Sequence, residues 1–341
     1  MNPSRLHRLW LALLSLCLLL SGCQAAPKAY DRQFPAMDTY MHLTAYGKGA
    51  ENALSAAQEE IIRLETLLDV TNEVSEVYAL NHRTADTLTL SDELAQLLSL
   101  SLTLAQETGG AFNPTVYPIV SQWGFTTGSY RLPSQEELSA LLPLADFNAA
   151  ALSGQTLTLH DGMQLDFGGI AKGWTGDRIL SMWKETGLTS GILRLGGNIQ
   201  TLGSKPDGSA WKVGIQDPKT EQPLAALAVR DKAVITSGSY QRYFTVSGQV
   251  YHHIIDPSTG YPAHTGLESV TVVGDSGARC DALSTALFVM GLEEATRFWR
   301  EHRDFEAIFI AEDGSITITA GMKDNFSLAD GYKDREVSVL E

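Results

Sequence analysis

The spacing of hydrophobic residues changes along this 341-residue chain, and the order of the changes restricts the folds that it can adopt. Between residues 51 and 69 apolar side chains recur every three or four positions, as on one face of a helix. A second helix is predicted to begin at Ser91 and to end at Gly109. A third is indicated by Ser134 and Glu137, which have the spacing of a capping box. Helices therefore dominate the early part of the predicted order.

Strand-like spacing dominates further along the chain. Residues 156–160 and 163–167 flank Asp161-Gly162, a dipeptide strongly favoured in the two-residue turn of a β-hairpin. A helix over 278–290, a second one after Gly291 and a hairpin around Asp313-Gly314 end the pattern. Further strands are predicted at 39–46, 192–195, 211–215, 224–236, 243–246, 250–255 and 269–273.

Strands and helices do not alternate regularly here, so a doubly wound parallel fold is not expected. The pattern predicts an α+β fold: a mixed, largely antiparallel sheet with flanking helices, in one compact unit or in two closely packed lobes. The 25 Lys and Arg residues are outnumbered by 40 Asp and Glu residues, which gives a formal net charge of -15. No basic surface is available to neutralise a phosphate backbone, and nucleic acid is not an expected partner.

The first residues of the chain have the pattern of a bacterial export signal. Arg5 and Arg8 precede an apolar run over 9–20, which is too short to cross a bilayer. Ser21, Gly22 and Cys23 then complete a lipobox-like sequence, so residues 1–22 are predicted to be a lipoprotein signal peptide and Cys23 the acylated first residue of the mature protein. A plain signal peptide with a coincidental cysteine is the alternative.

This N-terminus predicts a protein that works outside the cytoplasm. Residues 23–36 are expected to be a tether without regular structure, followed by one functional domain over 37–341. The lipid would hold that domain on a membrane, facing the periplasm or the cell surface. The inner and the outer membrane are both kept as alternatives.

A glycine turn followed by a helix is the first candidate for a ligand site. In the segment 165–174 a strand is expected to lead through Gly168 and Gly169 into a helix whose first backbone amides are unpaired. Such a helix start suits an anionic ligand, and Lys172 would add a positive charge. The alternative is a structural turn with Lys172 in solvent.

A second candidate lies on the predicted helix after residue 277. Asp281 and Thr285 are four residues apart, so their oxygens project from one helix face. Hard oxygen ligands of this kind favour Mg²⁺ over Zn²⁺, although Asp281 could instead complement the helix dipole. In the strand predicted at 250–255, His252 and His253 must point to opposite faces, whereas His253 and Ile255 share one.

Six short segments, taken together, point to a known family. In their order along the chain, they resemble the motifs of the FAD:protein FMN transferase family, the ApbE-like flavin transferases. The segments are 109–114, 165–173, 196–199, 236–238, 253–260 and 281–286. The resemblance extends over nearly the whole of the predicted mature chain. No Walker A loop, dinucleotide-binding fingerprint, His-Glu-x-x-His or nucleophile-elbow motif competes with it.

The resemblance implies an enzyme that binds FAD, cuts its pyrophosphate and attaches FMN to a threonine of a target protein through a phosphoester, releasing AMP. Mg²⁺ would be held by the carbonyl of Gly169, the carboxylate of Asp281 and the hydroxyl of Thr285. His253 matches the residue taken as catalytic, and the implied acceptors are flavin-carrying subunits of membrane electron-transport complexes.

The resemblance also implies which residues contact FAD. These are Met37, Thr71, Ala111, Phe112, Asn113, Asp166, Lys172 and Ile255. Two positions depart from the family pattern, because Asp38 replaces the glycine of a Met-Gly-Thr motif and Asn113 replaces a frequent aspartate. Two other functions are kept as alternatives: hydrolysis of FAD to free FMN and AMP, and flavin binding without catalysis.

Overall fold

The computed structural model describes residues 28–341, and its largest element is a nine-stranded sheet. The order along the sheet is β1 (Ala29–Ala36), β2 (Thr39–Tyr46), β6 (Ser190–Leu195), β7 (Asn198–Gly203), β10 (Ala233–Gly238), β13 (Leu267–Gly274), β14 (Glu306–Ala311), β15 (Ile316–Thr319) and β17 (Val337–Leu340). Neighbouring strands are antiparallel except β15 and β17, which are parallel. The predicted α+β class with a mixed, largely antiparallel sheet is confirmed.

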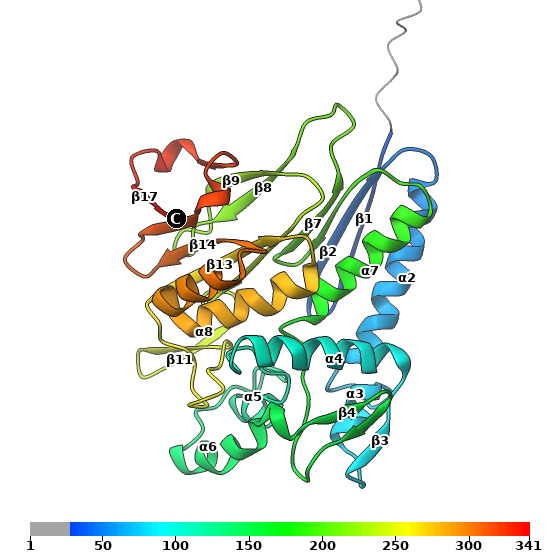
Figure 1. Ribbon diagram of the computed structural model, residues 1–341, viewed down its shortest axis with the longest axis vertical. Helices are drawn as coiled ribbons and strands as arrows, with labels where there is room; N and C mark the ends of the chain where they lie inside the picture. The colour runs from blue at the N-terminus through cyan, green and yellow to red at the C-terminus, as the bar shows by residue number, and fades with distance from the viewer. Residues whose placement is uncertain (1–27) are drawn as a thin grey trace, which may run out of the picture.

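Three helices cover one face of this sheet (Figure 1). α2 (Ala50–Leu68) packs on β1 and β2, α8 (Gly277–His302) packs on β10 and β13, and α7 (Ala171–Glu185) contacts both helices. The helix predicted at 51–69 is confirmed, because its apolar stripe is the buried face of α2. α8 changes direction at Gly291, whose φ of 75° and ψ of 168° are not helical, so the predicted break is also confirmed.

A second, three-stranded sheet covers the opposite face. It consists of β16 (Phe326–Leu328), β9 (Pro223–Val229) and β8 (Trp211–Gln216). Side chains such as Val213 and Leu227 pack there with Val234 and Ile308 of the large sheet. The predicted strand over 224–236 is therefore two strands, β9 and β10, which belong to different sheets.

The remaining α-helices lie along one end of the large sheet, where α4 (Asp92–Glu107) lies below α8 in the view of Figure 1. Ser91 caps α4 by accepting the N–H of Leu94, as its predicted start requires. The capping box of Ser134 and Glu137 is present at the start of α6, so that prediction is confirmed. The other elements of this region are α3 (Glu76–Asn81), α5 (Tyr117–Trp123), α6 (Gln135–Leu141), the small sheet β3 (Thr87–Thr89), β5 (Thr156–Thr158) and β4 (Ala151–Ser153), and the hairpin β11 (Tyr243–Val246) and β12 (Gln249–His252).

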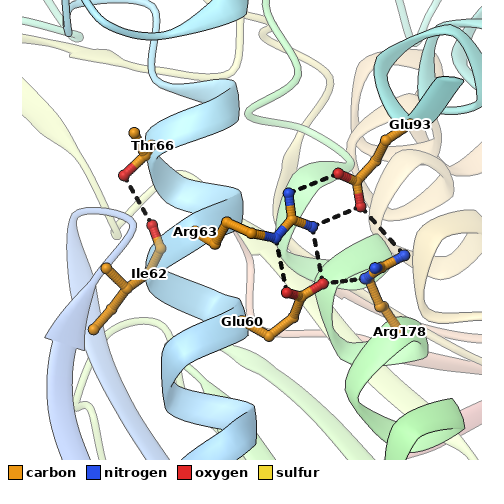
Figure 2. Close-up of polar contacts among 6 residues, drawn as sticks. All are labelled: Glu60, Ile62, Arg63, Thr66, Glu93 and Arg178. Carbon is orange, nitrogen blue, oxygen red and sulfur yellow. Dashed lines mark hydrogen bonds and ion pairs between the residues drawn. The ribbon is translucent and has the colours of Figure 1, made fainter. Parts of the chain in front are cut away.

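Four charged side chains connect α2, α4 and α7 (Figure 2). Arg63 lies between Glu60 and Glu93, at 2.8 Å from each carboxylate. Arg178 of α7 reaches the same two carboxylates and lies 3.2 Å from Glu93. The alternating charges join the helix layer to α4.

The hairpin predicted over 156–167 is wrong. β5 pairs instead with β3 and β4, and residues 163–167 form no strand. The amide of Asn81 bonds both backbone groups of Leu165, accepting from its N–H at 2.7 Å and donating to its carbonyl at 2.8 Å. Side-chain partners from far along the chain therefore replace the ladder that the Asp161-Gly162 turn predicted.

Two further boundaries need correction. The predicted tether over 23–36 is wrong for residues 29–36, which form β1 at the edge of the sheet, a position where Pro35 is tolerated. The strand predicted at 250–255 ends at His252.

The predicted signal peptide and Cys23 lie outside the described residues. Within residues 28–341, no helix combines the length and the apolar character needed to cross a membrane.

Candidate active site

A cleft of about 810 Å³ opens where several turns at one end of the large sheet meet the start of α7. The β1–β2 turn and the β6–β7 turn are adjacent because β2 pairs with β6, and Gly196 packs against Thr39. The end of β10 and the following loop complete this side, and Gly197 approaches the side chain of Gln241. The volume falls in the range of small-molecule sites.

All twelve predicted FAD, metal and catalytic residues line this cleft. They are Met37, Thr71, Ala111, Phe112, Asn113, Asp166, Gly169, Lys172, His253, Ile255, Asp281 and Thr285. Their positions in the sequence extend from residue 37 to residue 285, so the fold has brought together turns and helix starts that are distant along the chain. Cys23, predicted to be lipidated, is not among the described residues.

The crossing of α7 and α8 fixes the carboxylate of Asp281. At the crossing, a Cβ on Gly173 would lie 2.1 Å from the carbonyl oxygen of Gly277, so the two backbones touch. Asp281 is 5% exposed, and its Oδ2 accepts the N–H of Gly173 at 2.8 Å. Its Oδ1 forms no hydrogen bond with any described residue. One oxygen thus ties the helices together while the other is available to a ligand.

Gly169 and Thr285 lie beside this carboxylate. A Cβ placed on Gly169 would be 3.7 Å from Oγ1 of Thr285 and 3.3 Å from the ring of Phe112. The Thr285 hydroxyl also lies 3.2 Å from the hydroxyl of Ser237, which in turn contacts Ser284 at 2.7 Å. The backbone of Gly169 and the side chains of Asp281 and Thr285 are therefore grouped in one part of the cleft.

These groups suit a hard cation through their chemistry. A carbonyl, a carboxylate and a hydroxyl are the kinds of oxygen that Mg²⁺ accepts, and Oδ1 of the buried residue Asp281 has no partner within residues 28–341. Within residues 28–341, however, no cluster of three or more His, Cys, Asp or Glu side chains could hold a metal ion. In addition to the carbonyl of Gly169, the carboxylate of Asp281 and the hydroxyl of Thr285, a cation here would need further oxygen ligands, such as phosphate oxygens or water.

Two side chains that the sequence did not single out hold the α7–α8 crossing. Asp177 of α7 accepts the N–H groups of Gly277 at 2.6 Å and Ala278 at 3.0 Å, which caps the start of α8. Burial raises the pKa of Asp177. Gln200 donates to the carbonyl of Gly173 at 2.8 Å. Neither residue matches a local motif, because each acts on a segment distant in sequence.

His252 and His253 point to opposite sides, as predicted. His252 is buried, lies 3.0 Å from the carbonyl of Ala263 through Nε2 and accepts the N–H of Ile254 through Nδ1. His253 lines the cleft, and its Nδ1 lies 3.3 Å from the carbonyl of Arg242. Because a carbonyl can only accept, Nδ1 of His253 carries the proton and Nε2 keeps its lone pair.

The environment keeps His253 neutral. Burial, with a contribution from the charge of Arg242, lowers its pKa to about 3. Although β12 ends at His252, both His253 and Ile255 line the cleft, and Ile255 is held by a bridge to Pro262. A neutral imidazole and an apolar side chain are thus available to a bound molecule.

The segment before α7 forms the turn that the sequence predicted, without the strand. Asp166 accepts the N–H of Gly168 at 2.6 Å, and burial raises the pKa of its carboxyl. α7 begins at Ala171 with no side-chain cap, and Lys172 follows in its first turn. A cation at this end opposes the helix dipole, so an anion bound there would interact favourably with both.

The other predicted FAD contacts form the walls of the cleft. Phe112 is buried beside Gly169. The amide of Asn113 is used by other protein groups, because it donates to the carbonyl of Ala145 at 2.6 Å and accepts the N–H of Thr115 at 2.8 Å. Asn113 therefore shapes the wall and has little capacity left for a ligand. Ala111 precedes it in the same wall.

Met37 and Thr71 complete the wall near the C-terminal end of α2. Met37 has a φ of 49° and donates its N–H to Glu65 at 2.5 Å. The N–H and hydroxyl of Thr71 both contact Oδ1 of Asp69 at 2.7 Å. Carboxylates of α2 and the segment after it thus hold both residues at the cleft.

A mixed sheet with helices that cross beside a cleft of this size defines a protein with a small-molecule site at one end of the sheet. Residues 37–309 match the model of the ApbE family. The FAD:protein FMN transferase of Treponema pallidum is 34% identical over 91% of this chain and 92% of its own length. A FAD:protein FMN transferase of Klebsiella pneumoniae is 31% identical over 83% of this chain and 90% of its own length.

The fold agrees with solved structures of the same family. The ApbE protein of Thermotoga maritima aligns with a TM-score of 0.83 and 29% identity, covering 87% of this chain and 99% of that one. The chain therefore belongs to the ApbE family and is a transferase, which confirms the resemblance of its six motifs.

Proposed function

We propose that this protein transfers FMN from FAD to a threonine hydroxyl of a target protein in a Mg²⁺-dependent reaction that releases AMP. The activity corresponds to the names of its relatives, FAD:protein FMN transferase. The observation that carries the proposal is the meeting, in one cleft, of the Gly169 backbone, Asp281 and Thr285 with the unprotonated Nε2 of His253.

The residues of the cleft have distinct parts in this reaction. Gly169, Asp281 and Thr285 would hold Mg²⁺, which when bound neutralises negative charge on phosphate oxygens. Lys172, at the start of α7, binds the pyrophosphate through charge. His253 Nε2 accepts the proton of the threonine hydroxyl as its oxygen attacks the FMN phosphorus. The bond from that phosphorus to the bridging oxygen breaks, and AMP leaves with the bridging oxygen.

The proposed partner is a flavin-carrying subunit of a membrane electron-transport complex, and the proposed location is a membrane surface outside the cytoplasm. Both follow from the family resemblance and from the lipobox-like sequence before Cys23. A lipid anchor would confine enzyme and acceptor to the same membrane.

Mass spectrometry of an acceptor protein tests the proposal. We expect the full-length enzyme, FAD and Mg²⁺ to add one FMN to a threonine of a co-expressed acceptor subunit and to release AMP. Free FMN and AMP without the adduct would identify FAD hydrolysis, and intact FAD would identify a flavin-binding protein.

Two variants in the same assay test the residues. An acceptor with the threonine changed to alanine should remain unmodified. Asp281→Ala should abolish the metal-dependent reaction, and full turnover by the wild type in excess chelator would contradict the proposed metal.

A further inference from the structure

Arg242 lies in the cleft beside His253 and has no part in the function proposed above. It follows β10 in the loop that leads into β11. Its carbonyl accepts the backbone N–H of His253 at 3.0 Å and lies 3.3 Å from Nδ1 of the same residue. The backbone of Arg242 is therefore fixed against the histidine.

The guanidinium of Arg242 has almost no fixed protein partner. It forms no hydrogen bond with any described side chain or backbone group, and its nearest carboxylate is Asp38, with Nη1 3.8 Å from Oδ2. Both side chains are well exposed, at 42% and 77%, so this is a loose ion pair. Asp38 belongs to the β1–β2 turn, so the pair joins two neighbouring turns on the same side of the cleft.

The charges that line the cleft are unbalanced for an anionic ligand. Six carboxylates line it, and only Lys172 and Arg242 among the described Lys and Arg residues do so. The carboxylates are Asp38, Glu65, Asp69, Asp166, Glu221 and Asp281. FAD brings a pyrophosphate with two further negative charges. Besides the proposed Mg²⁺, only Lys172 and Arg242 among the lining residues could offset this charge, and the five donors of a guanidinium suit phosphate oxygens.

We propose that Arg242 binds a phosphate of FAD, and that Asp38 holds its guanidinium while no phosphate is bound. This assignment rests on the proposed use of FAD. Asp38 then competes with the ligand for the same cation, which gives a function to this exposed acidic residue of the β1–β2 turn. The charge of Arg242 also acts on Asp166 and His253, in agreement with a position near both.

Equilibrium binding of FAD to the full-length protein tests the assignment. Arg242→Gln should weaken FAD binding about tenfold, the lower end for a charge-assisted hydrogen bond because the side chain is half exposed. The FAD affinity of Arg242→Lys should lie between that of this variant and that of the wild type, because lysine keeps the positive charge but lacks the paired N–H donors of the guanidinium. Asp38→Asn should tighten binding about two- to fivefold by freeing the guanidinium.

The Asp38→Asn change is matched to its position. Asp38 has a φ of 56°, and asparagine accepts this left-handed conformation as readily as aspartate. Arg230→Gln is the control for a change of net charge, because Arg230 is exposed, donates to the carbonyl of Gly208 and does not line the cleft. It should leave FAD binding unchanged. Thermal unfolding of each variant verifies that it is folded.

Opposite effects of the two cleft substitutions are the decisive result. If Arg242→Gln binds FAD like the wild type, or if Asp38→Asn weakens binding as Arg242→Gln does, the pair is structural and the assignment is wrong. A wild type that binds no FAD would instead contradict the proposed function itself. A wild type that binds FAD but modifies no acceptor would leave the binding comparison valid.

Discussion

Two adjacent histidines have different chemistry because their surroundings differ. His252 has both ring nitrogens engaged by the protein, whereas His253 has one nitrogen fixed by Arg242 and the other directed to no described partner. The sequence predicted that they face opposite ways, because neighbouring residues of a strand do. The sequence could not predict which of the two histidines is buried, because Ala263 and Phe288, which cover His252, come from other segments.

Replacing His253 should separate binding from transfer. We expect His253→Ala to bind FAD like the wild type and to lose FMN transfer about 10²- to 10⁴-fold, the usual contribution of a general base. Transfer is measured by the mass of the acceptor and binding by flavin fluorescence. The exposed His160, which does not line the cleft, provides a matched control in His160→Ala. Unchanged transfer by His253→Ala would remove its proposed role.

His252 should make the protein less stable in mild acid. Burial lowers its pKa to about 4 from an ordinary 6.5, and a proton on Nδ1 would face the N–H of Ile254. Between pH 6.5 and 4, His252 is therefore protonated in the unfolded chain but neutral in the folded protein. The free energy of unfolding decreases as the pH falls through this range. The loss from His252 alone should be about 1.5 kcal/mol between pH 6.5 and 5.

Urea unfolding at several pH values measures this loss, and an NMR titration of the imidazole resonances measures its cause. His252 should not titrate above pH 5. In His252→Gln the dependence of the unfolding free energy on pH should be smaller than in the wild type. A midpoint for His252 near 6.5 would show that the folded protein accepts the proton and would contradict the prediction.

At the level of helices and strands, α2, α4 and α7 are connected by the ion pairs of Figure 2. Arg63 and Arg178 lower the pKa of Glu60 to about 2 from an ordinary 4.5. A depressed carboxyl pKa contributes stability that is present above pH 4.5 and is lost as pH falls toward 2. Since α7 carries Lys172 and Gly173, these pairs also support the wall of the cleft.

We expect Glu60→Gln to reduce the free energy of unfolding at pH 7 by about 1 to 2 kcal/mol, a value lowered by the solvent exposure of both arginines. The difference from the wild type should decrease below pH 4.5. Glu59→Gln is the control, because Glu59 is exposed and forms no ion pair with a described residue. Equal effects of the two substitutions at pH 7 would show that the network adds nothing to stability.

Elements that depend on local signals could be predicted, and those that depend on distant partners could not. The stripe of α2, the Ser134 capping box and the break at Gly291 are encoded within a few residues. The segment 163–167 is not, because Asn81 bonds Leu165 across 84 positions. The same holds in the cleft, where motifs pointed to Asp281 but not to Asp177, which positions its helix.

Considered as a whole molecule, the described chain enters the large sheet at the end of β1 that is away from the cleft. That strand begins at Ala29, and the turn that follows it contributes Met37 and Asp38 to the cleft. Eight residues of strand span about 25 Å. Residues 24–28 lie between Cys23 and β1, and even a fully extended chain of this length reaches only about 20 Å. An acylated Cys23 would thus keep the cleft near the membrane without contributing to it.

This separation predicts that anchoring and chemistry can be uncoupled. Cys23→Ser should move the protein from the membrane to the soluble fraction and remove the acyl mass, while FAD binding and transfer to a detergent-solubilised acceptor stay at the wild-type level. Cys17→Ser, which changes the cysteine inside the predicted signal peptide, should keep both the acyl mass and the membrane location. Retention of Cys23→Ser on the membrane would contradict the lipid anchor, and loss of FAD binding would show that the N-terminal segment belongs to the site.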